Sequence, residues 1–454
     1  MIKKTLLTAL FTLLIIVNKA QTQNSAFSLQ QAIDYSLKNS PNYLNAELDE
    51  KNAFYKKNEI AGLGLPQITG SFDFKDYFNI PVSIVDASAF NPTIPKGSVY
   101  QVLSFGLKYN ASAGFSASQL LFSADYIFGL KAAKEYIALS KISAQRTKTE
   151  LIAQVSKAYY GVLINKERLK LIDANIVKLD KSLSDLKAFN KQGLVELIDV
   201  ERLEVANNNL FTEKEKVIQL ISVGENLLKF QIGYKINESI ALTDSLKLTE
   251  DLKQDIKINN SDFSKRDDYQ LIKAQNNLLD IDVKRLKWGY LPTLAAYGSY
   301  QYNTIRPNAN IFESDKNNAV KQWYPISLIG VTANLNIFDG LQRNYKIQQA
   351  KITLQKNSNN LKNIEMVAEL ESSIAAITFN NATKTLKNNE RNMDLAKHIY
   401  EVAQKKFEQG VGSNLEIVNA QASIREAEIN YFNAIYDLLI AKIDYQKAIG
   451  TLVK

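Results

Sequence analysis

The sequence contains no cysteine and only one histidine, His398, among its 454 residues. Without cysteine, the chain can form no disulfide, no thiolate metal site and no thiol nucleophile. His398 has no second candidate ligand near it in the sequence, so we expect a packing or surface residue rather than a metal ligand. Glycine-rich nucleotide-binding patterns are absent as well. We therefore expect neither an enzyme, nor a metal site, nor a cofactor.

Long apolar runs are also missing after the N-terminus, so no later transmembrane helix is expected. Residues 1–20 have a basic start, an apolar core between Leu6 and Val17, and the small residue Ala20 at the end. This pattern predicts a secretory signal peptide that is cleaved near residue 20. The alternative is a membrane anchor, although the apolar run is short for crossing a core of about 30 Å.

Charge of one sign is not concentrated anywhere in the chain. The formal net charge is +8, from 55 basic and 47 acidic residues, and no dense basic run is present. Nucleic acid is therefore not an expected partner. With 46% apolar and 22% charged residues, the composition indicates a folded protein with a mixed, solvated surface.

The chain repeats a set of features once. GLPQITGSFDF at 64–74 corresponds to GYLPTLAAYGSY at 289–300, and each stretch contains a Leu-Pro pair. FNKQGLVELIDV at 189–200 corresponds in the same way to FEQGVGSNLEIV at 407–418. Solenoid repeats are only about 20–50 residues long, so this wide spacing predicts two structural halves.

We place the halves at 21–233 and 264–454, joined by a polar linker at 234–263. Each half is predicted to contain a helix, two strands and a long helical hairpin. The tip of the first hairpin is expected near Gly193 and the tip of the second near Gly410, because glycine readily adopts the positive φ that ends a helix.

Apolar and polar residues alternate in the segments predicted as strands. One face is apolar and the other is small or polar, which suits a barrel with lipid outside and water inside. An antiparallel sheet over a soluble core gives the same alternation, and the pattern alone does not separate the two. The regions 79–102 and 305–327 are interpreted as long loops. The four predicted strands are 67–78, 103–121, 293–304 and 328–338.

A long apolar stripe predicts a coiled-coil helix. Its spacings alternate between three and four residues for five heptads, with one position skipped. A helix from Ala124 to Lys187 would be roughly 95 Å long and would need partner helices along its whole length. We expect residues 341–406 to be that partner. The stripe consists of Leu151, Val155, Ala158, Val162, Leu169, Ile172, Ile176, Leu179, Leu183 and Leu186.

The order of these features resembles the TolC family of outer-membrane factors over essentially the whole mature chain. The most specific parts are FNKQGLVELIDV, FEQGVGSNLEIV and NIFDG at 336–340. Members of the family are homotrimers in which each protomer gives four strands to one twelve-stranded outer-membrane β-barrel. Long antiparallel helices continue as a periplasmic α-barrel. The resemblance thus implies a mainly α fold with transmembrane β-strands, in the outer membrane of a Gram-negative-type bacterium.

The same resemblance implies a function. Family members conduct substrates passively, as the outer-membrane channel of a tripartite efflux or type I secretion system. Their partners are outer-membrane lipid, a periplasmic adaptor protein and an inner-membrane pump of the RND or ABC type. Two alternatives stay open: a non-conducting periplasmic coiled-coil scaffold with a soluble β-domain, and an adaptor-type protein. An adaptor usually has one such hairpin, whereas two are expected here.

Several site residues follow from the resemblance by position. Gly193 and Gly410 correspond to the turn glycines at the periplasmic tip, and Leu194 and Val411 to exposed adaptor contacts. For two prolines there is also a physical argument. Pro66 and Pro292 cannot continue an α-helix, so they are expected where a helix ends and a strand begins.

The acidic residues six places after each turn glycine, Asp199 and Glu416, correspond to positions that close the tunnel. Three copies of Glu416 would form a ring of carboxylates that selects cations. Each acid could instead simply favour the first turn of its helix. The chain also departs from better-known members: Asn419 replaces a second constriction aspartate, Gly412 a gate arginine, and Phe407 a gate tyrosine. A closed state held by salt bridges is thus in question.

Overall fold

The computed structural model describes residues 25–104, 106–246 and 262–453. The predicted signal peptide at 1–20 and half of the predicted linker, residues 247–261, lie outside these residues. Within them, none of the helices is long and apolar enough to cross a membrane.

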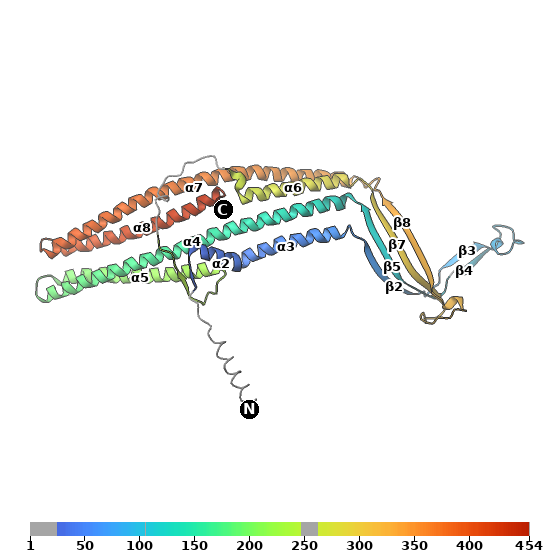
Figure 1. Cartoon of the computed structure of the whole chain (residues 1–454), viewed down its shortest axis with the longest axis horizontal. Helices are drawn as coiled ribbons and strands as arrows, with labels where there is room; N and C mark the ends of the chain where they lie inside the picture. Colours follow the sequence, from blue (N-terminus) through green and yellow to red (C-terminus); the bar gives the residue numbers. More distant parts are fainter. Residues whose placement is uncertain (1–24, 105, 247–261, 454) are drawn as a thin grey trace, which may run out of the picture. The chain divides into compact units, whose positions relative to one another are not determined.

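Groups of strands and groups of helices follow one another along the chain (Figure 1). The helices are α2 (Leu29–Asn39), α3 (Pro41–Gly62), α4 (Ala124–Lys191), α5 (Leu197–Ile232), α6 (Asp267–Trp288), α7 (Gln342–Glu408) and α8 (Asn414–Ala448). The strands are β1 (Ser25–Phe27), β2 (Gln67–Asp76), β3 (Val82–Asp86), β4 (Tyr100–Ser104), β5 (Tyr109–Phe122), β6 (Ile240–Leu242), β7 (Thr293–Arg306) and β8 (Tyr324–Asn334).

Two compact units divide these elements between them. One, the helical unit, takes its residues from 1–50, 140–273 and 359–454. The other, the sheet unit, takes its residues from 51–139 and 274–358.

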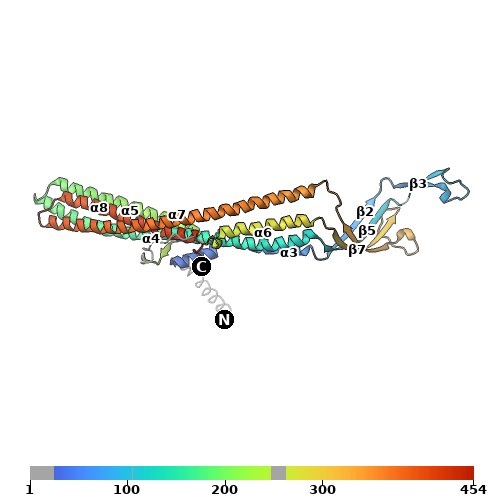
Figure 2. The same ribbon diagram turned by 90° about the horizontal axis from the view of Figure 1, so that it is seen from above.

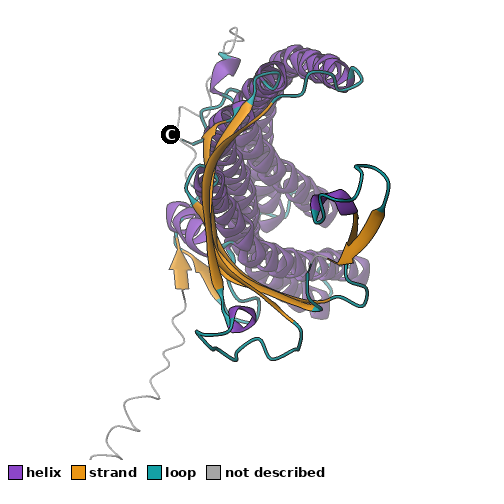
Figure 3. Cartoon of the chain, turned by 90° about the vertical axis from the view of Figure 1, so that its right-hand side faces the viewer, coloured by secondary structure: helices purple, strands orange, loops and turns teal. Residues whose placement is uncertain are grey.

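The sheet unit contains a four-stranded antiparallel sheet in the order β2-β5-β7-β8, which is curved (Figure 3). Residues directly opposite each other lie on the same face. Phe72 is opposite Ala113, which is in turn opposite Tyr302, so the alternating apolar residues of the strands share one face. On the other face, the hydroxyls of Thr69 and Ser116 lie 2.7 Å apart.

The predicted strand boundaries need correction at two places. The stretch predicted as one strand at 103–121 is divided between two strands: Leu103 and Ser104 belong to β4, and β5 begins at Tyr109. Gly106, with a φ of 136°, lies at the interruption between them. The strand predicted at 328–338 runs from Tyr324 to Asn334 instead. It ends there because Asn334 is opposite Thr293, the first residue of β7, and no partner strand continues beyond it.

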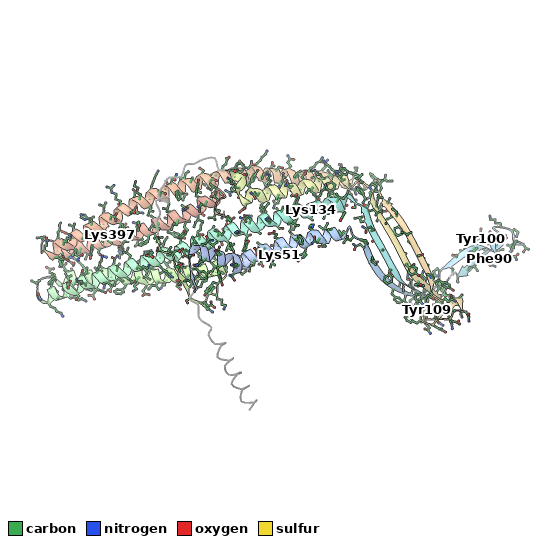
Figure 4. All side chains as sticks on the ribbon, in the orientation of Figure 1. Lys51, Phe90, Tyr100, Tyr109, Lys134 and Lys397 are labelled. Atoms are coloured by element: carbon green, nitrogen blue, oxygen red, sulfur yellow. The ribbon has the colours of Figure 1, made fainter. Side chains whose placement is uncertain are left out.

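The region 79–102, interpreted as a loop, contains a strand. β3 pairs with β4 in an antiparallel hairpin, with Ile84 opposite Val102. Figure 4 marks Phe90 and Tyr100 on this hairpin. Three prolines in the region concealed the hairpin, but they lie outside the paired residues, where a missing N–H costs no ladder bond.

The two Leu-Pro pairs lie at the ends of helices. Pro66 is between Gly62, which ends α3, and Gln67, which begins β2. Pro292 directly precedes Thr293, the first residue of β7. In both places the ring removes the N–H that another helical turn would use.

The helical unit contains two antiparallel hairpins, α4–α5 and α7–α8, which run alongside one another (Figures 1 and 2). Nine of the ten residues of the predicted stripe on α4 are buried, and only Leu169 is half-buried. The stripe itself packs against α5, as Ile172 and Leu179 show. The expected partner 341–406 contacts α4 outside the stripe, where Ile164 shares a buried cluster with Phe379 and Leu386 of α7. The turn at 192–196 is so short that α5 must fold back directly against α4.

The α4–α5 seam generates a testable prediction. Leu179 is fully buried in this seam, whereas Val177, two residues earlier, is 69% exposed. Leu179→Ala should reduce the free energy of unfolding by about 2–5 kcal/mol, because it removes buried methyl groups and leaves a cavity. The matched change Val177→Ala should alter it by less than about 0.5 kcal/mol. Thermal unfolding followed by circular dichroism measures both, and equal effects would contradict this packing.

Candidate functional site

The two hairpin turns are built in the same way. Gly193 and Gly410 have φ angles of 75° and 74°, in the left-handed region. In the first turn, the N–H of Gly193 donates to the Asn190 carbonyl at 2.9 Å and the N–H of Leu194 to the Phe189 carbonyl at 3.0 Å. In the second turn, Gly410 and Val411 donate in the same pattern, at 2.9 and 3.0 Å. Both helices thus end in a Schellman motif, which requires the left-handed residue that glycine supplies.

The residue after each turn glycine is apolar and exposed. In a Schellman motif this residue often packs back onto its own helix. Here Leu194 is 67% exposed and Val411 is 76% exposed, so neither does. Leu197 and Leu415, in the first turns of α5 and α8, are also exposed. The tips therefore present apolar side chains that the chain itself leaves uncovered.

A hydrogen bond joins the two tips. Asn414, the first residue of α8, donates from Nδ2 to the Asp199 carbonyl at 2.8 Å and lies 3.4 Å from the Asp199 carboxylate. Asn414 is buried, and Phe407 packs against apolar residues of both hairpins beside it. Sequence reasoning missed Asn414 because nothing in the local pattern distinguishes it from an ordinary first-turn residue.

Asp199 and Glu416, which each follow a turn glycine by six residues, differ in their surroundings. Asp199 is half-buried and pairs with Arg202 at 3.5 Å in addition to its contact with Asn414. Glu416 is exposed, and its backbone N–H faces the hydroxyl of Ser413, which caps α8. Among the described residues, Glu416 has no ion-pair partner. Asn419 is exposed as well.

Further polar contacts join α4 to α8 away from the tips. Glu150 pairs with Lys447, and Lys157 pairs with Asp444 at 2.5 Å. Closer to the tips, the Asn175 amide donates to both carboxylate oxygens of Glu428, at 2.9 and 3.1 Å. The contact between the hairpins thus changes from ion pairs to asparagine hydrogen bonds as the tips are approached.

Glu428 is the most unusual of these acids because it is buried. Burial raises the pKa of its carboxyl above the ordinary value. The hydrogen bond from Asn175 and the charges of Lys397 and Lys178 oppose the shift without cancelling it. Figure 4 marks Lys397, on α7.

Groups of acidic or histidine side chains that could hold a metal ion are not found in the part of the chain that the structure describes. His398 has no metal-binding neighbours there.

Comparison with known proteins gives a consistent result. The family model described as outer membrane efflux protein matches residues 273–451. The outer membrane protein TolC of Vibrio cholerae is 21% identical over 344 residues, covering 75% of this chain and 77% of that protein. TolC of Escherichia coli K12 is 21% identical over 445 residues, covering 94% and 83%. The crystal structure of the Campylobacter jejuni CmeC outer membrane channel superposes with a TM-score of 0.73 at 16% identity, covering 93% of this chain and 86% of that one.

These matches confirm the resemblance to the TolC family of outer membrane efflux proteins that the order of sequence features indicated. The solved channel shares the fold over nearly the whole chain.

The buried Glu428 generates a prediction on pH dependence. Because its pKa is raised, the folded state binds the proton more tightly than the unfolded chain does, so stability falls as pH rises from the ordinary value of 4.5 through the raised pKa. Glu428→Gln should therefore be more stable than the wild type at pH 8. Its midpoint temperature of thermal unfolding should also fall less between pH 5 and pH 8. Glu426→Gln, which alters an exposed acid on the same helix, is the control and should leave the profile unchanged. If the stability of Glu428→Gln depends on pH in the same way as that of the wild type, Glu428 does not cause the pH dependence.

Proposed function

With the resemblance to the outer membrane efflux family as premise, we propose that three copies of this chain form an outer-membrane channel. The edge strands carry the proposal. β2 and β8, of 10 and 11 residues, each pair on one side only in the described sheet. In lipid, the unpaired backbone groups of their other sides would be costly. Pairing β2 of one copy with β8 of the next satisfies them, and three copies close twelve strands.

The two faces of the sheet support the same arrangement. On the apolar face, Ile68 is 72% exposed and Ile329 is 90% exposed, although both belong to well-paired strands. The opposite face carries small and polar residues at the positions of β2 and β5, among them Thr69 and Ser116. Lipid against the first face and water against the second suit a transmembrane barrel.

The exposed tips support a periplasmic partner. Leu194 and Val411 are uncovered although their motif usually buries them, and exposed apolar groups of this kind mark interaction sites. We assign the tips to the adaptor of a tripartite efflux or type I secretion system. The inner-membrane pump, of the RND or ABC type, would supply the energy, because the channel conducts passively.

Glu416 is assigned to the constriction. It is exposed and has no ion-pair partner among the described residues, so three copies would place three free carboxylates around the tunnel mouth. Such a ring concentrates cations and repels anions. Asp199, in contrast, is engaged by Asn414 and Arg202 within its own copy. Phe407 and Asn419 complete the mouth, without a gate tyrosine or a second constriction acid.

Electrical recording tests this proposal. The detergent-solubilised protein should be a trimer and should conduct ions, with a preference for cations, in a planar bilayer. Glu416→Gln should lower the cation-to-anion permeability ratio severalfold, because it removes the charge of the ring. Glu401→Gln, an exposed acid two turns higher on α7, is the control. Unchanged selectivity would refute the ring, and a soluble, non-conducting periplasmic protein would favour the scaffold alternative.

The turn glycines generate a second test. A side chain at Gly193 would meet no atom within 4 Å, so only the backbone angle opposes substitution. Gly193→Val should cost roughly 1–2 kcal/mol in this left-handed conformation and reshape the tip. We expect trimers to persist while adaptor binding, measured by co-purification, falls severalfold.

Gly62→Val is the matched control for this change. A side chain at Gly62 would likewise meet no atom within 4 Å, but the φ of Gly62 is not positive. Full adaptor binding by Gly193→Val would show that binding does not depend on the conformation of this turn.

A further inference from the structure

The β3–β4 hairpin carries an exposed apolar face. Ile84 is directly opposite Val102, and Val82 and Tyr100 lie on the same face, each two residues away along its strand. Ile84 and Val102 are 71% and 65% exposed, and Val82 and Tyr100 are 57% and 63% exposed. This face is therefore left uncovered by the part of the chain that the structure describes.

The β-hairpin is a defined element rather than a loose loop. At its end, the Asp86 carboxylate accepts hydrogen bonds from the N–H groups of Ser88, at 3.0 Å, and Gly97, at 2.6 Å. These bonds lower the pKa of the Asp86 carboxyl. The N–H of Ala87 donates to the Val99 carbonyl at 2.9 Å, which continues the pairing beyond the two strands. The β-hairpin thus holds its apolar face in one conformation through its own backbone.

Charge is scarce in the segment that contains the β-hairpin. Residues 77–104 include only two charged residues, Asp86 and Lys96. The loop between β7 and β8, residues 307–323, is shorter and yet includes four charged residues. Depletion of charge is typical of the centre of a protein interface, whereas a segment that only meets water usually carries charges.

The β-hairpin lies on the concave side of the four-stranded sheet. Figure 1 shows it beyond the end of the sheet that is opposite the helices of the same unit. Figure 3 shows it to the right of the curved strands, on their inner side. A barrel closes around the concave side of its sheet. The three-fold axis of the proposed trimer therefore lies on the side toward which the β-hairpin extends.

The position of the apolar face indicates what covers it. A two-stranded hairpin is only marginally stable in water without further packing. Lipid would lie against the convex side of a barrel, whereas the β-hairpin is on the concave side. Rotation about the three-fold axis brings the β-hairpins of the other two copies to the same height on this side. Identical apolar faces can then cover one another, and the Asp86 carboxylate stays hydrogen-bonded within its own turn.

We propose that the β3–β4 hairpins of three copies pack together through their apolar faces around the three-fold axis and narrow the outer end of the channel. This inference rests on the trimer of the proposed function and adds a constriction distinct from the one at the tips. The partner of each apolar face is thus another copy of this chain. An apolar constriction admits water poorly, so it obstructs ions without any charged group.

The absence of cysteine allows a direct test. Ile84→Cys is introduced into the full-length chain, and the detergent-solubilised protein is oxidised. One thiol per copy can join only two copies, so the expected product on a non-reducing gel is a covalent dimer. Ser83→Cys is the matched control, because Ser83 is also exposed but lies on the opposite face. Ile84→Cys should give about tenfold more dimer, because neighbouring thiols react at high effective concentration.

Single-channel recording provides a second measurement on the same two variants. Oxidation should lower the current through Ile84→Cys severalfold, because the disulfide holds two β-hairpins together at the axis. Reductant should restore this current, and the current through Ser83→Cys should not change under either treatment. A current through Ile84→Cys that oxidation leaves unaltered would show that the β-hairpins do not narrow the channel.

Mass measurement separates the possible failures. If the protein is a trimer by light scattering but Ile84→Cys gives no more dimer than the control, the β-hairpin contact is overturned and the channel proposal stands. A protein that is not trimeric would overturn both. If the thiol of Ile84→Cys in the trimer reacts with a charged maleimide as fast as that of Ser83→Cys, the apolar face is open to water or to a different partner. That result would also contradict the contact between copies.

Discussion

The two unpaired edges of the sheet are the constraint on which the rest of the structure depends. β2 and β8 end the four-stranded order, and the backbone groups along their outer sides need partners wherever water is absent. A ring of copies supplies those partners without adding a strand.

The polar contacts between the two hairpins change in kind toward the tips. Away from the tips, two ion pairs and close packing hold α4 to α8. Nearer the tips, the polar contacts are hydrogen bonds of Asn175 and Asn414, each worth about 1 kcal/mol net, which is no less than an exposed ion pair contributes. The apolar contact of Phe407 with both hairpins adds to them. The two tips are thus joined to each other by the contacts of Asn414 and by the packing of Phe407.

Local sequence signals predicted the elements well and their partners poorly. The useful signals act within a few residues, so they can be recognised without the tertiary structure. They are the glycines at 193 and 410, the prolines at 66 and 292 and the heptad stripe on α4. The heptad stripe showed that α4 is covered, but it could not show that α5 covers the stripe itself while α7 packs against other residues of α4, such as Ile164. Asn414 and Glu428 carried no signal at all, since their roles arise from contacts with residues more than 200 positions away. The β3–β4 hairpin was missed because its prolines outweighed a short alternation.

The two halves of the chain have come to use equivalent positions differently. Asp199 and Glu416 each follow a turn glycine by six residues, yet Asp199 is occupied by Asn414 and Arg202 of its own copy. An acid that is already hydrogen-bonded gains little from a further partner in another copy, whereas Glu416 has its full charge available. Gly412 offers no side chain to neutralise it. The two equivalent positions thus differ in their contacts within one copy: Asp199 is hydrogen-bonded and paired, whereas Glu416 is exposed and has no ion-pair partner among the described residues.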